Sequence, residues 1–367
     1  MMEIQKEKIL EVLSGIRHPE TRENIVEMGM VRDTGYREGN LWLSLQFSRA
    51  NDPFIQSIKK ACTRAVNNAF GADTLEEGYI QVMVPEAPAK PEILPEVKNI
   101  VAVASGKGGV GKSTVAANLA VALARTGSTV GLIDADVYGP SIPKMFNVED
   151  QRPAARTEDG SEWIIPIEKH GVKLLSVGFF VRPEDAVIWR GPMATSALKQ
   201  LISQGDWGTL DYLLIDLPPG TGDVHLTMVQ EVPVTGVVIV STPQEVALAD
   251  VVKGINMFTG EKINVPVLGI IENMSWFTPE ELPDNRYYIF GKEGCRKLAE
   301  KTGIPLLGEI PIIQGIRESG DAGEPVALFP DKLSGKAFLN LAEAVRTAVE
   351  TRNAELQPTK KVEITTR

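Results

Sequence analysis

Nine consecutive residues in the first third of the chain have the types and spacing of a phosphate-binding loop. They read Gly106-Lys107-Gly108-Gly109-Val110-Gly111-Lys112-Ser113-Thr114 and fit the P-loop pattern G-x-x-x-x-G-K-S/T. Glycines let backbone N–H groups approach an anion closely, and the dipole of a following helix favours negative charge there. The motif predicts a bound nucleoside triphosphate, with Lys112 at its β- and γ-phosphates and the Ser113 hydroxyl on Mg²⁺.

Lys107 is an addition to that pattern. Lys112 already supplies the usual charge, and two lysines from one chain would crowd one triphosphate. A lysine at the outer edge of the loop can instead reach a facing subunit and neutralise its transition state, as an arginine finger does. This interpretation predicts a homodimer; the alternative is a solvated surface lysine.

Carboxylates follow two further apolar runs, 129–133 and 212–215. Asp134 and Asp136 come after the first run and Asp216 after the second. Because a parallel sheet binds ligands at the carboxyl ends of its strands, these side chains are expected near the P-loop. Asp136 can orient the attacking water or hold Mg²⁺ through water, and Asp216 matches a Walker B carboxylate. The alternatives are a solvated acidic turn and a core strand that ends in a turn.

The loop after Asp216 reads Leu217-Pro218-Pro219-Gly220-Thr221-Gly222-Asp223. Its two prolines make a stiff turn into a glycine-flanked loop. The N–H of Gly220 can contact a γ-phosphate, so the loop is predicted to sense whether that phosphate is present.

Apolar periodicity and turn signals divide the chain into four parts. Residues 1–84 are predicted to form a small α+β domain, with helices at 4–13 and 53–70 and strands at 24–31, 41–47 and 79–84. The four prolines of 85–98 indicate a linker. Residues 99–350 are predicted to form an α/β domain with a mostly parallel sheet flanked by helices. Its expected strands are 100–104, 129–133, 172–177, 212–216, 236–241, 267–271 and 306–310, and residues 351–367 are expected to form a polar tail.

Composition excludes several classes of protein. There is no apolar run of membrane-spanning length, and the first eight residues are too charged for a signal peptide, so a cytoplasmic protein is expected. A net charge of −10 disfavours nucleic-acid and anionic-membrane partners. Cys62 and Cys295, the two cysteines, exclude a disulfide framework or a C-x-x-C metal pair within one chain. The scattered histidines, His18, His170 and His225, are expected to be structural or on the surface.

The motifs together resemble a known family. The segments G-K-G-G-V-G-K-S-T, D-A-D-V-Y-G-P-S at 134–141 and D-L-P-P-G-T-G-D at 216–223 are similar to those of deviant-Walker-A ATPases related to MinD, ParA and nitrogenase iron protein. Together with Ile271-Glu272-Asn273-Met274, they resemble most the Mrp/ApbC family of ATP-binding iron–sulfur cluster carriers. The resemblance covers about residues 97–350, and residues 1–84 resemble the small domain of SufT-type iron–sulfur assembly proteins.

The resemblance implies a slow, dimer-dependent ATPase that uses ATP and Mg²⁺ and transfers clusters to apo iron–sulfur client proteins. It implies that Lys107 crosses the dimer, that Asp136 orients water and that Asp216 is the Walker B residue. Asn273 resembles the residue that contacts adenine, and an amide suits this role because it can both donate and accept hydrogen bonds.

The chain departs from the family in two places. Family members with a bridging cluster carry C-x-x-C shortly after the Glu-Asn-Met, whereas residues 275–291 hold no cysteine and Cys295 lies beyond them. Cys295 is therefore the candidate ligand of a labile [4Fe–4S] cluster. A dimer supplies two such thiolates, and four with Cys62 if the small domain docks at the dimer seam. In the small domain, the family's Asp-Pro-Glu appears as His18-Pro19-Glu20.

Two other functions remain open from the sequence. The missing C-x-x-C favours an ATP-gated assembly scaffold without a cluster of its own. A MinD- or ParA-like positioning ATPase is the other, although Pro358 interrupts the helical spacing that a C-terminal membrane-binding helix needs.

Overall fold

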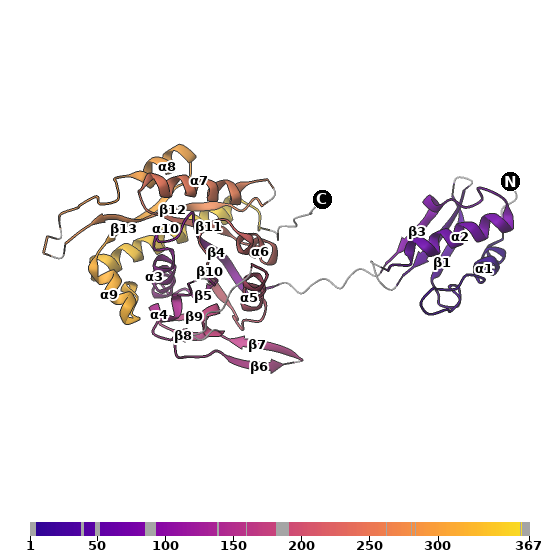
Figure 1. Ribbon diagram of the computed structural model, residues 1–367, viewed down its shortest axis with the longest axis horizontal. Coiled ribbons are helices and arrows are strands. Elements are labelled where there is room, and N and C mark those ends of the chain that lie inside the picture. Colours follow the sequence, from indigo (N-terminus) through magenta and orange to yellow (C-terminus); the bar gives the residue numbers. More distant parts are fainter. Residues whose placement is uncertain are drawn as a thin grey trace. The chain divides into compact units, whose positions relative to one another are not determined.

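The chain folds into two compact units, Met1–Pro91 and Glu92–Arg367 (Figure 1). The structure is a computed structural model, and each unit has a hydrophobic core of its own. It describes residues 5–37, 40–47, 52–84, 93–137, 139–158, 160–180, 191–261, 263–279, 281–282, 284–359 and 361.

The first unit is a small α+β domain, as predicted, in which two helices accompany a three-stranded sheet. β1 and β2 pair antiparallel, and β3 adds to β2 in parallel. Ile58 and Cys62 of the long helix are buried in the same core as Leu43 and Leu45 of the central strand. The elements are α1 (Lys6–Leu13), β1 (Val31–Arg37), β2 (Asn40–Gln46), α2 (Ile55–Phe70), η1 (Glu77–Tyr79) and β3 (Ile80–Met83).

The predicted strand at 24–31 is wrong. Residues 25–29 form turns, and the strand begins only at Val31. The Asn24 side chain accepts a hydrogen bond from the N–H of Val26 at 2.8 Å, and Gly29 has a φ of 69°. A side-chain oxygen that binds the backbone two residues on offers it an alternative to a sheet ladder.

The second unit contains an eight-stranded sheet in the order β13-β12-β11-β4-β10-β5-β9-β8. All neighbours in it are parallel except β8, which pairs antiparallel with β9. This confirms the predicted fold class. Its elements are β4 (Val97–Ser105), α3 (Lys112–Arg125), β5 (Val130–Asp134), α4 (Ile142–Met145), β6 (Ala154–Glu158), β7 (Ser161–Ile165), β8 (Ile167–Lys169), β9 (Val172–Ser176), η2 (Val177–Phe180), α5 (Gly191–Ser203), β10 (Leu210–Asp216), α6 (Asp223–Glu231), β11 (Gly236–Ser241), α7 (Glu245–Thr259), β12 (Val267–Phe277), α8 (Gly294–Thr302), β13 (Leu306–Ile312), α9 (Gln314–Ala322), η3 (Val326–Leu328) and α10 (Leu333–Glu355).

The central strand β4 shows why the sheet is covered on both faces. Val101 and Val103 belong to one buried cluster, and Ile100 and Ala102 belong to another. Side chains alternate between the two faces of a strand, so a continuous apolar run contributes side chains to a hydrophobic core on each face of the sheet. Helices α3 and α10 pack on the first face and α5 to α8 on the second (Figure 1).

Two predicted boundaries of this unit are corrected. Of the predicted linker, residues 85–92 lie outside the described residues. Ile93 and Leu94 pack against the core of the second unit and β4 begins at Val97, so residues 93–98 belong to that unit. α10 continues to Glu355, five residues into the predicted tail. The exposed hairpin β6–β7 was not predicted, since its strands bury little apolar surface.

Candidate functional site

The P-loop connects β4 to α3, as the motif requires. Lys112 is the first residue of α3, and Ser113 and Thr114 complete the start of its first turn. Gly109 and Gly111 have φ values of 81° and 78°, a left-handed conformation that glycine adopts at little cost. The loop can therefore turn its backbone N–H groups inward at a helix N-terminus, the arrangement that binds phosphate.

Sheet register brings the predicted carboxylates to the same edge. Asp216, the last residue of β10, is paired with Val103 of β4 on one side and with Asp134 of β5 on the other. Both carboxylates are fully buried. Residues 82 positions apart in sequence thus become neighbours because their strands are adjacent and parallel.

Lys112 is the centre of this cluster. Its Nζ lies 2.6 Å from Asp216 Oδ1 and 3.8 Å from Asp136 Oδ2, and it donates to the Ser113 Oγ at 3.3 Å. The Lys112 side chain is 6% exposed, so these interactions are little screened by water. The structure therefore brings the predicted lysine, hydroxyl and two carboxylates together at the P-loop.

Burial sets the protonation of the two inner carboxylates. It raises the pKa of Asp134 to about 7, with the charge of Asp216 as the next cause. Burial also raises the pKa of Asp216, against the opposing effect of Lys112. The Ser176 hydroxyl donates to Asp134 Oδ2 at 2.9 Å. Burial therefore favours the protonated form of these two carboxyls, and a cation bound beside them would favour their ionised form.

The environment of Asp216 Oδ2 shows whether these residues fit a magnesium ion. This oxygen is buried and has no hydrogen-bond partner among the residues that the structure describes. The Ser113 hydroxyl also interacts with the Asp216 carboxyl. Mg²⁺ prefers oxygen ligands and usually binds one or two protein groups together with phosphates and water. The donor set formed by Ser113 and Asp216 fits that preference.

Lys107 is half-buried at the outer part of the loop. No ion pair joins it to any residue within the described ranges. Its carbonyl accepts a hydrogen bond from the Ser105 Oγ at 3.0 Å, which holds the backbone. The side chain is thus available to a facing molecule.

Gly106 lies where α7 packs against the base of the loop. A Cβ here would lie 2.5 Å from the carbonyl carbon of Asp250 and 2.7 Å from the nitrogen of Val251. We expect Gly106→Ala to displace the loop and to lower the free energy of unfolding by about 1–3 kcal/mol, the cost of overpacking. Urea denaturation measures this. Gly108→Ala is the control, because its Cβ would meet nothing closer than 3.9 Å, and equal losses in both variants would contradict the prediction.

Asn273, in β12, contacts the loop directly. Its Nδ2 donates to the carbonyl of Val110 at 2.8 Å, and a Cβ at Gly111 would lie 2.3 Å from that nitrogen. The amide therefore fastens the P-loop, a role that the sequence did not predict. Its contact with adenine stays a prediction.

The predicted sensor loop is tied to β4. The N–H of Gly220 donates to the carbonyl of Ser105 at 3.0 Å. A contact between this N–H and a γ-phosphate would have to replace that bond. The loop thus has a defined alternative partner, as a two-state switch requires.

His225, directly after this loop in α6, was expected from the sequence to be structural or on the surface, and no role at this loop was predicted for it. Its side chain is 1% exposed, and the ring interacts with the backbone of Gly222 and Pro218. Its ring centroid lies 6.2 Å from that of Phe258 in α7. Burial lowers the pKa of His225 to about 4. The signal available in the sequence was only its position two residues after Asp223.

This depressed pKa predicts a pH dependence. Between pH 6.5 and 4 the unfolded chain binds a proton at His225 that the folded chain does not, so this group lowers stability as the pH falls. Relative to His225→Phe, the wild type should lose about 2 kcal/mol of unfolding free energy from pH 8 to pH 5. Denaturation of both proteins at these pH values tests this, since other groups cancel in the difference. A pH-independent difference would contradict it.

The two cysteines are both buried and lie in different units. Burial raises the pKa of Cys62 to about 12 and also raises the pKa of Cys295. Cys295 sits at the start of α8, where its N–H donates to Glu272 Oε2 at 2.8 Å and its thiol to the carbonyl of Thr242. Within the described ranges, no three His, Cys, Asp or Glu residues are placed to hold a metal ion. As placed, neither thiol fits an accessible cluster ligand.

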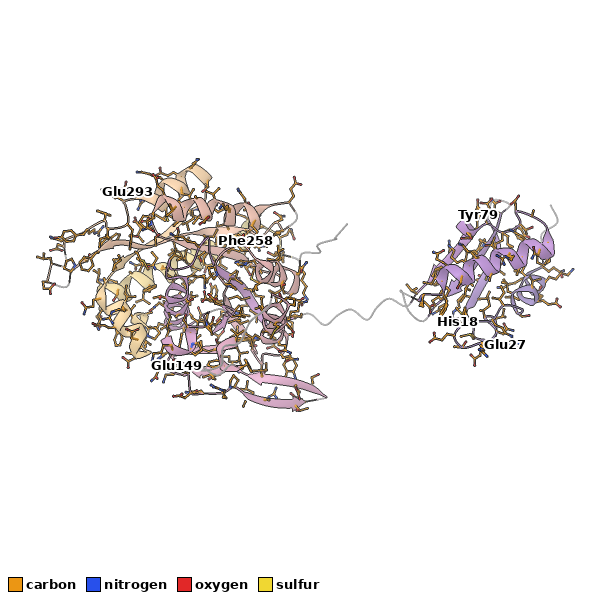
Figure 2. The ribbon with its side chains drawn as sticks, in the orientation of Figure 1. His18, Glu27, Tyr79, Glu149, Phe258 and Glu293 are labelled. Atoms are coloured by element: carbon orange, nitrogen blue, oxygen red, sulfur yellow. The ribbon has the colours of Figure 1, made fainter. Side chains whose placement is uncertain are left out.

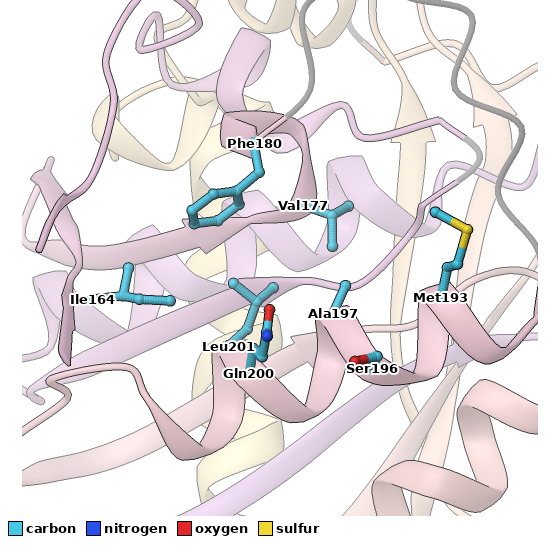
Figure 3. Close-up of a pocket in the computed structure, with 8 residues that line it drawn as sticks. All are labelled: Ile164, Val177, Phe180, Met193, Ser196, Ala197, Gln200 and Leu201. Carbon is cyan, nitrogen blue, oxygen red and sulfur yellow. The ribbon is translucent and has the colours of Figure 1, made fainter. Parts of the chain in front are cut away.

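Two further features involve residues that are not members of the phosphate-site cluster. His18, where the family has an aspartate, is buried against Phe54 and accepts a hydrogen bond from the N–H of Glu20 (Figure 2). A pocket of about 340 Å³ is lined by Phe180, Met193 and other uncharged side chains (Figure 3). Without a charged group, that pocket is not a phosphate site.

Comparison with known proteins identifies the family. The model of the NUBPL iron-transfer P-loop NTPases matches residues 96–346. The chain belongs to this family. A second model, of iron–sulfur cluster assembly proteins, matches residues 6–74. The family assignment and the small-domain resemblance predicted from the motifs are thereby confirmed.

Curated relatives extend over both units. An iron–sulfur cluster carrier protein of Synechocystis sp. is 42% identical over 92% of this chain and 96% of its own. One from Aquifex aeolicus is 51% identical over 71% of this chain and 70% of its own. The solved structure of a nucleotide-binding protein from Archaeoglobus fulgidus in complex with ADP has 40% identity and a TM-score of 0.56, covering 65% of this chain and 91% of that one.

In the part of the chain that the structure describes, no helix has the length and apolar character needed to cross a lipid bilayer. This agrees with the absence of a long apolar run in the sequence.

Proposed function

We propose that this NUBPL-family protein is a Mg²⁺-dependent ATPase that acts as a homodimer and carries iron–sulfur clusters to apo client proteins. The observation that carries the proposal is the convergence of Lys112, Ser113, Asp136 and Asp216 at a P-loop, in a chain matched over both units by iron–sulfur carriers. The phosphate site supports the ATPase, and the family supports the client class.

The chain's own residues divide the hydrolysis between them. Backbone N–H groups of the P-loop and Lys112 bind the phosphates, and Asp136 orients the attacking water. Ser113 and Asp216 would hold Mg²⁺, which would neutralise phosphate charge when bound. Lys112 changes partner from Asp216 to phosphate as the nucleotide enters. This exchange leaves Asp216 free to ligate the metal.

Each subunit completes the site of the other. The free Lys107 side chain of one subunit reaches the γ-phosphate held by its partner and stabilises the charge that develops there. Turnover is slow until the dimer closes, so a client protein or a cluster that promotes closure would control the rate of ATP hydrolysis.

The cluster is the cargo, and its ligands do not follow from the described geometry. Two buried thiols of raised pKa in separate units do not form a ready cluster site. The same observation favours the second candidate function, an ATP-gated scaffold that presents a client without holding a cluster of its own.

Anaerobic reconstitution separates the two candidates. The protein is supplied with iron and sulfide, and visible absorption reports whether a cluster binds. An apo [4Fe–4S] enzyme is then added with and without MgATP, and its recovered activity reports transfer. A carrier shows both signals, and the absorption falls in Cys62→Ala or Cys295→Ala. A scaffold shows ATP-dependent recovery without absorption. Recovery no faster than with free iron and sulfide would contradict both functions.

A further inference from the structure

A cavity of about 300 Å³ lies at the end of the sheet opposite the P-loop. It is bounded by the first residues of β4, by the loop before β11 and by the end of α10. Its walls are mixed: Leu94, Ile100, Pro233 and Leu356 are among the apolar residues, and Lys98, Thr235, Arg352, Asn353 and Thr359 are polar or charged. The proposed ATPase does not use this cavity, because β4 runs from it toward the phosphate site.

Arg352 lines the cavity as a buried cation. Its side chain is 9% exposed, and no acidic side chain in the described ranges pairs with it. The guanidinium donates to Asn353 Oδ1 at 3.0 Å, to the carbonyl of Gln357 at 2.9 Å and to Thr359 Oγ at 2.5 Å. All three acceptors are neutral. Its Nε is buried and has no partner among the described residues.

Such an arrangement is costly without an anion. A buried charge is normally paired, and an unmatched buried donor loses the hydrogen bond that it makes to water. Holding the segment after α10 explains two of the contacts of Arg352 but neither the free Nε nor the cavity beside it. Lys98 also lines the cavity, but its charge is already paired with Asp211 at 2.7 Å.

We propose that this cavity binds a small organic carboxylate with an apolar body. Carboxylate oxygens accept charge-assisted hydrogen bonds from a guanidinium, and the Nε–H of Arg352 has no other acceptor among the described residues. The apolar side of the cavity, formed by residues such as Ile100 and Pro233, favours a hydrocarbon body over a fully polar anion such as phosphate, whose remaining oxygens would be desolvated there. Leu94 has a φ of 61°, an uncommon conformation for a leucine, and it lies against the cavity. A ligand here would therefore join the entry of the second unit to the end of α10.

Isothermal titration calorimetry on the full chain tests this with hexanoate, acetate and inorganic phosphate at equal ionic strength. Hexanoate is expected to bind saturably with one site per chain, more tightly than acetate, and phosphate not to bind at this site. Arg352→Gln should weaken hexanoate at least tenfold. Arg346→Gln is the control, because Arg346 lies on the same helix but is half-buried outside the cavity lining and pairs with Glu343, so binding should be unchanged.

A second variant keeps the test decisive if Arg352→Gln folds poorly. Leu356 is 50% exposed at the cavity, so Leu356→Glu leaves Arg352 in place and supplies a carboxylate of the chain's own. It should bind no hexanoate and melt no lower than the wild type. Three results would overturn the proposal: no saturable carboxylate binding to the wild type, preferential binding of phosphate, or wild-type affinity in Arg352→Gln or Leu356→Glu.

Discussion

Lys112→Met is expected to abolish ATP binding and hydrolysis together. The substitution removes the phosphate contact and leaves the fully buried Asp216 without its counter-charge. Breaking a buried ion pair in this way costs about 3–5 kcal/mol while the remaining group stays ionised. Burial already raises the pKa of Asp216, so the carboxyl takes up a proton more readily and the loss of stability shrinks as the pH falls.

The two effects of Lys112→Met are measured separately. Equilibrium binding of a fluorescent ATP analogue reports the phosphate contact, and urea denaturation at pH 6 and pH 8 reports stability. The double variant Lys112→Met/Asp216→Asn is the matched control, which should recover stability but not binding. A single variant that binds nucleotide within threefold of the wild type would show that Lys112 does not hold the phosphates.

Lys107→Ala is expected to leave ATP affinity within threefold of the wild type and to reduce hydrolysis by about 10³-fold, the scale of an arginine finger. The side chain has no ion pair within the described part of the chain, so its removal disturbs little of the subunit's own site. Steady-state turnover and nucleotide binding measure the two quantities. Lys253→Ala, an exposed lysine of α7, serves as the control and should change neither.

Mixing two inactive proteins decides whether Lys107 acts across the dimer. Lys107→Ala keeps Asp136 but lacks the finger, and Asp136→Asn keeps the finger but lacks the water-orienting carboxylate. In a mixed dimer, the site with Asp136 receives Lys107 from its partner. Activity should return to about a quarter of the wild type, since half of the dimers are mixed and each has one complete site. A mixture as inactive as its parts would place Lys107 in its own subunit's site.

Much of the fold was predictable because local patterns of apolar residues in the sequence indicate its strands. The apolar runs predicted the seven parallel strands, since strands buried on both faces need apolar residues at every position. The edge strand β8 and the exposed hairpin β6–β7 lack that signature. The incorrectly predicted strand at 24–31 shows the limit of this reasoning. Its apolar residues are present, but the Asn24 side chain accepts a hydrogen bond from the Val26 N–H and favours a turn over a strand.

The sequence by itself determined the phosphate chemistry, because a P-loop needs only consecutive residues and their local conformations. The strand-end positions of Asp136 and Asp216 also predicted that they lie near it, but the tertiary structure decided the contacts themselves. Strand register placed Asp216 beside Asp134, and folding brought Lys112 to Asp216 and Asn273 to Val110. It also buried both cysteines and the His225 ring, and it left the Arg352 Nε without a partner among the residues that the structure describes. These outcomes depend on packing between segments far apart in the chain, and no local pattern encodes the environment that a side chain acquires there.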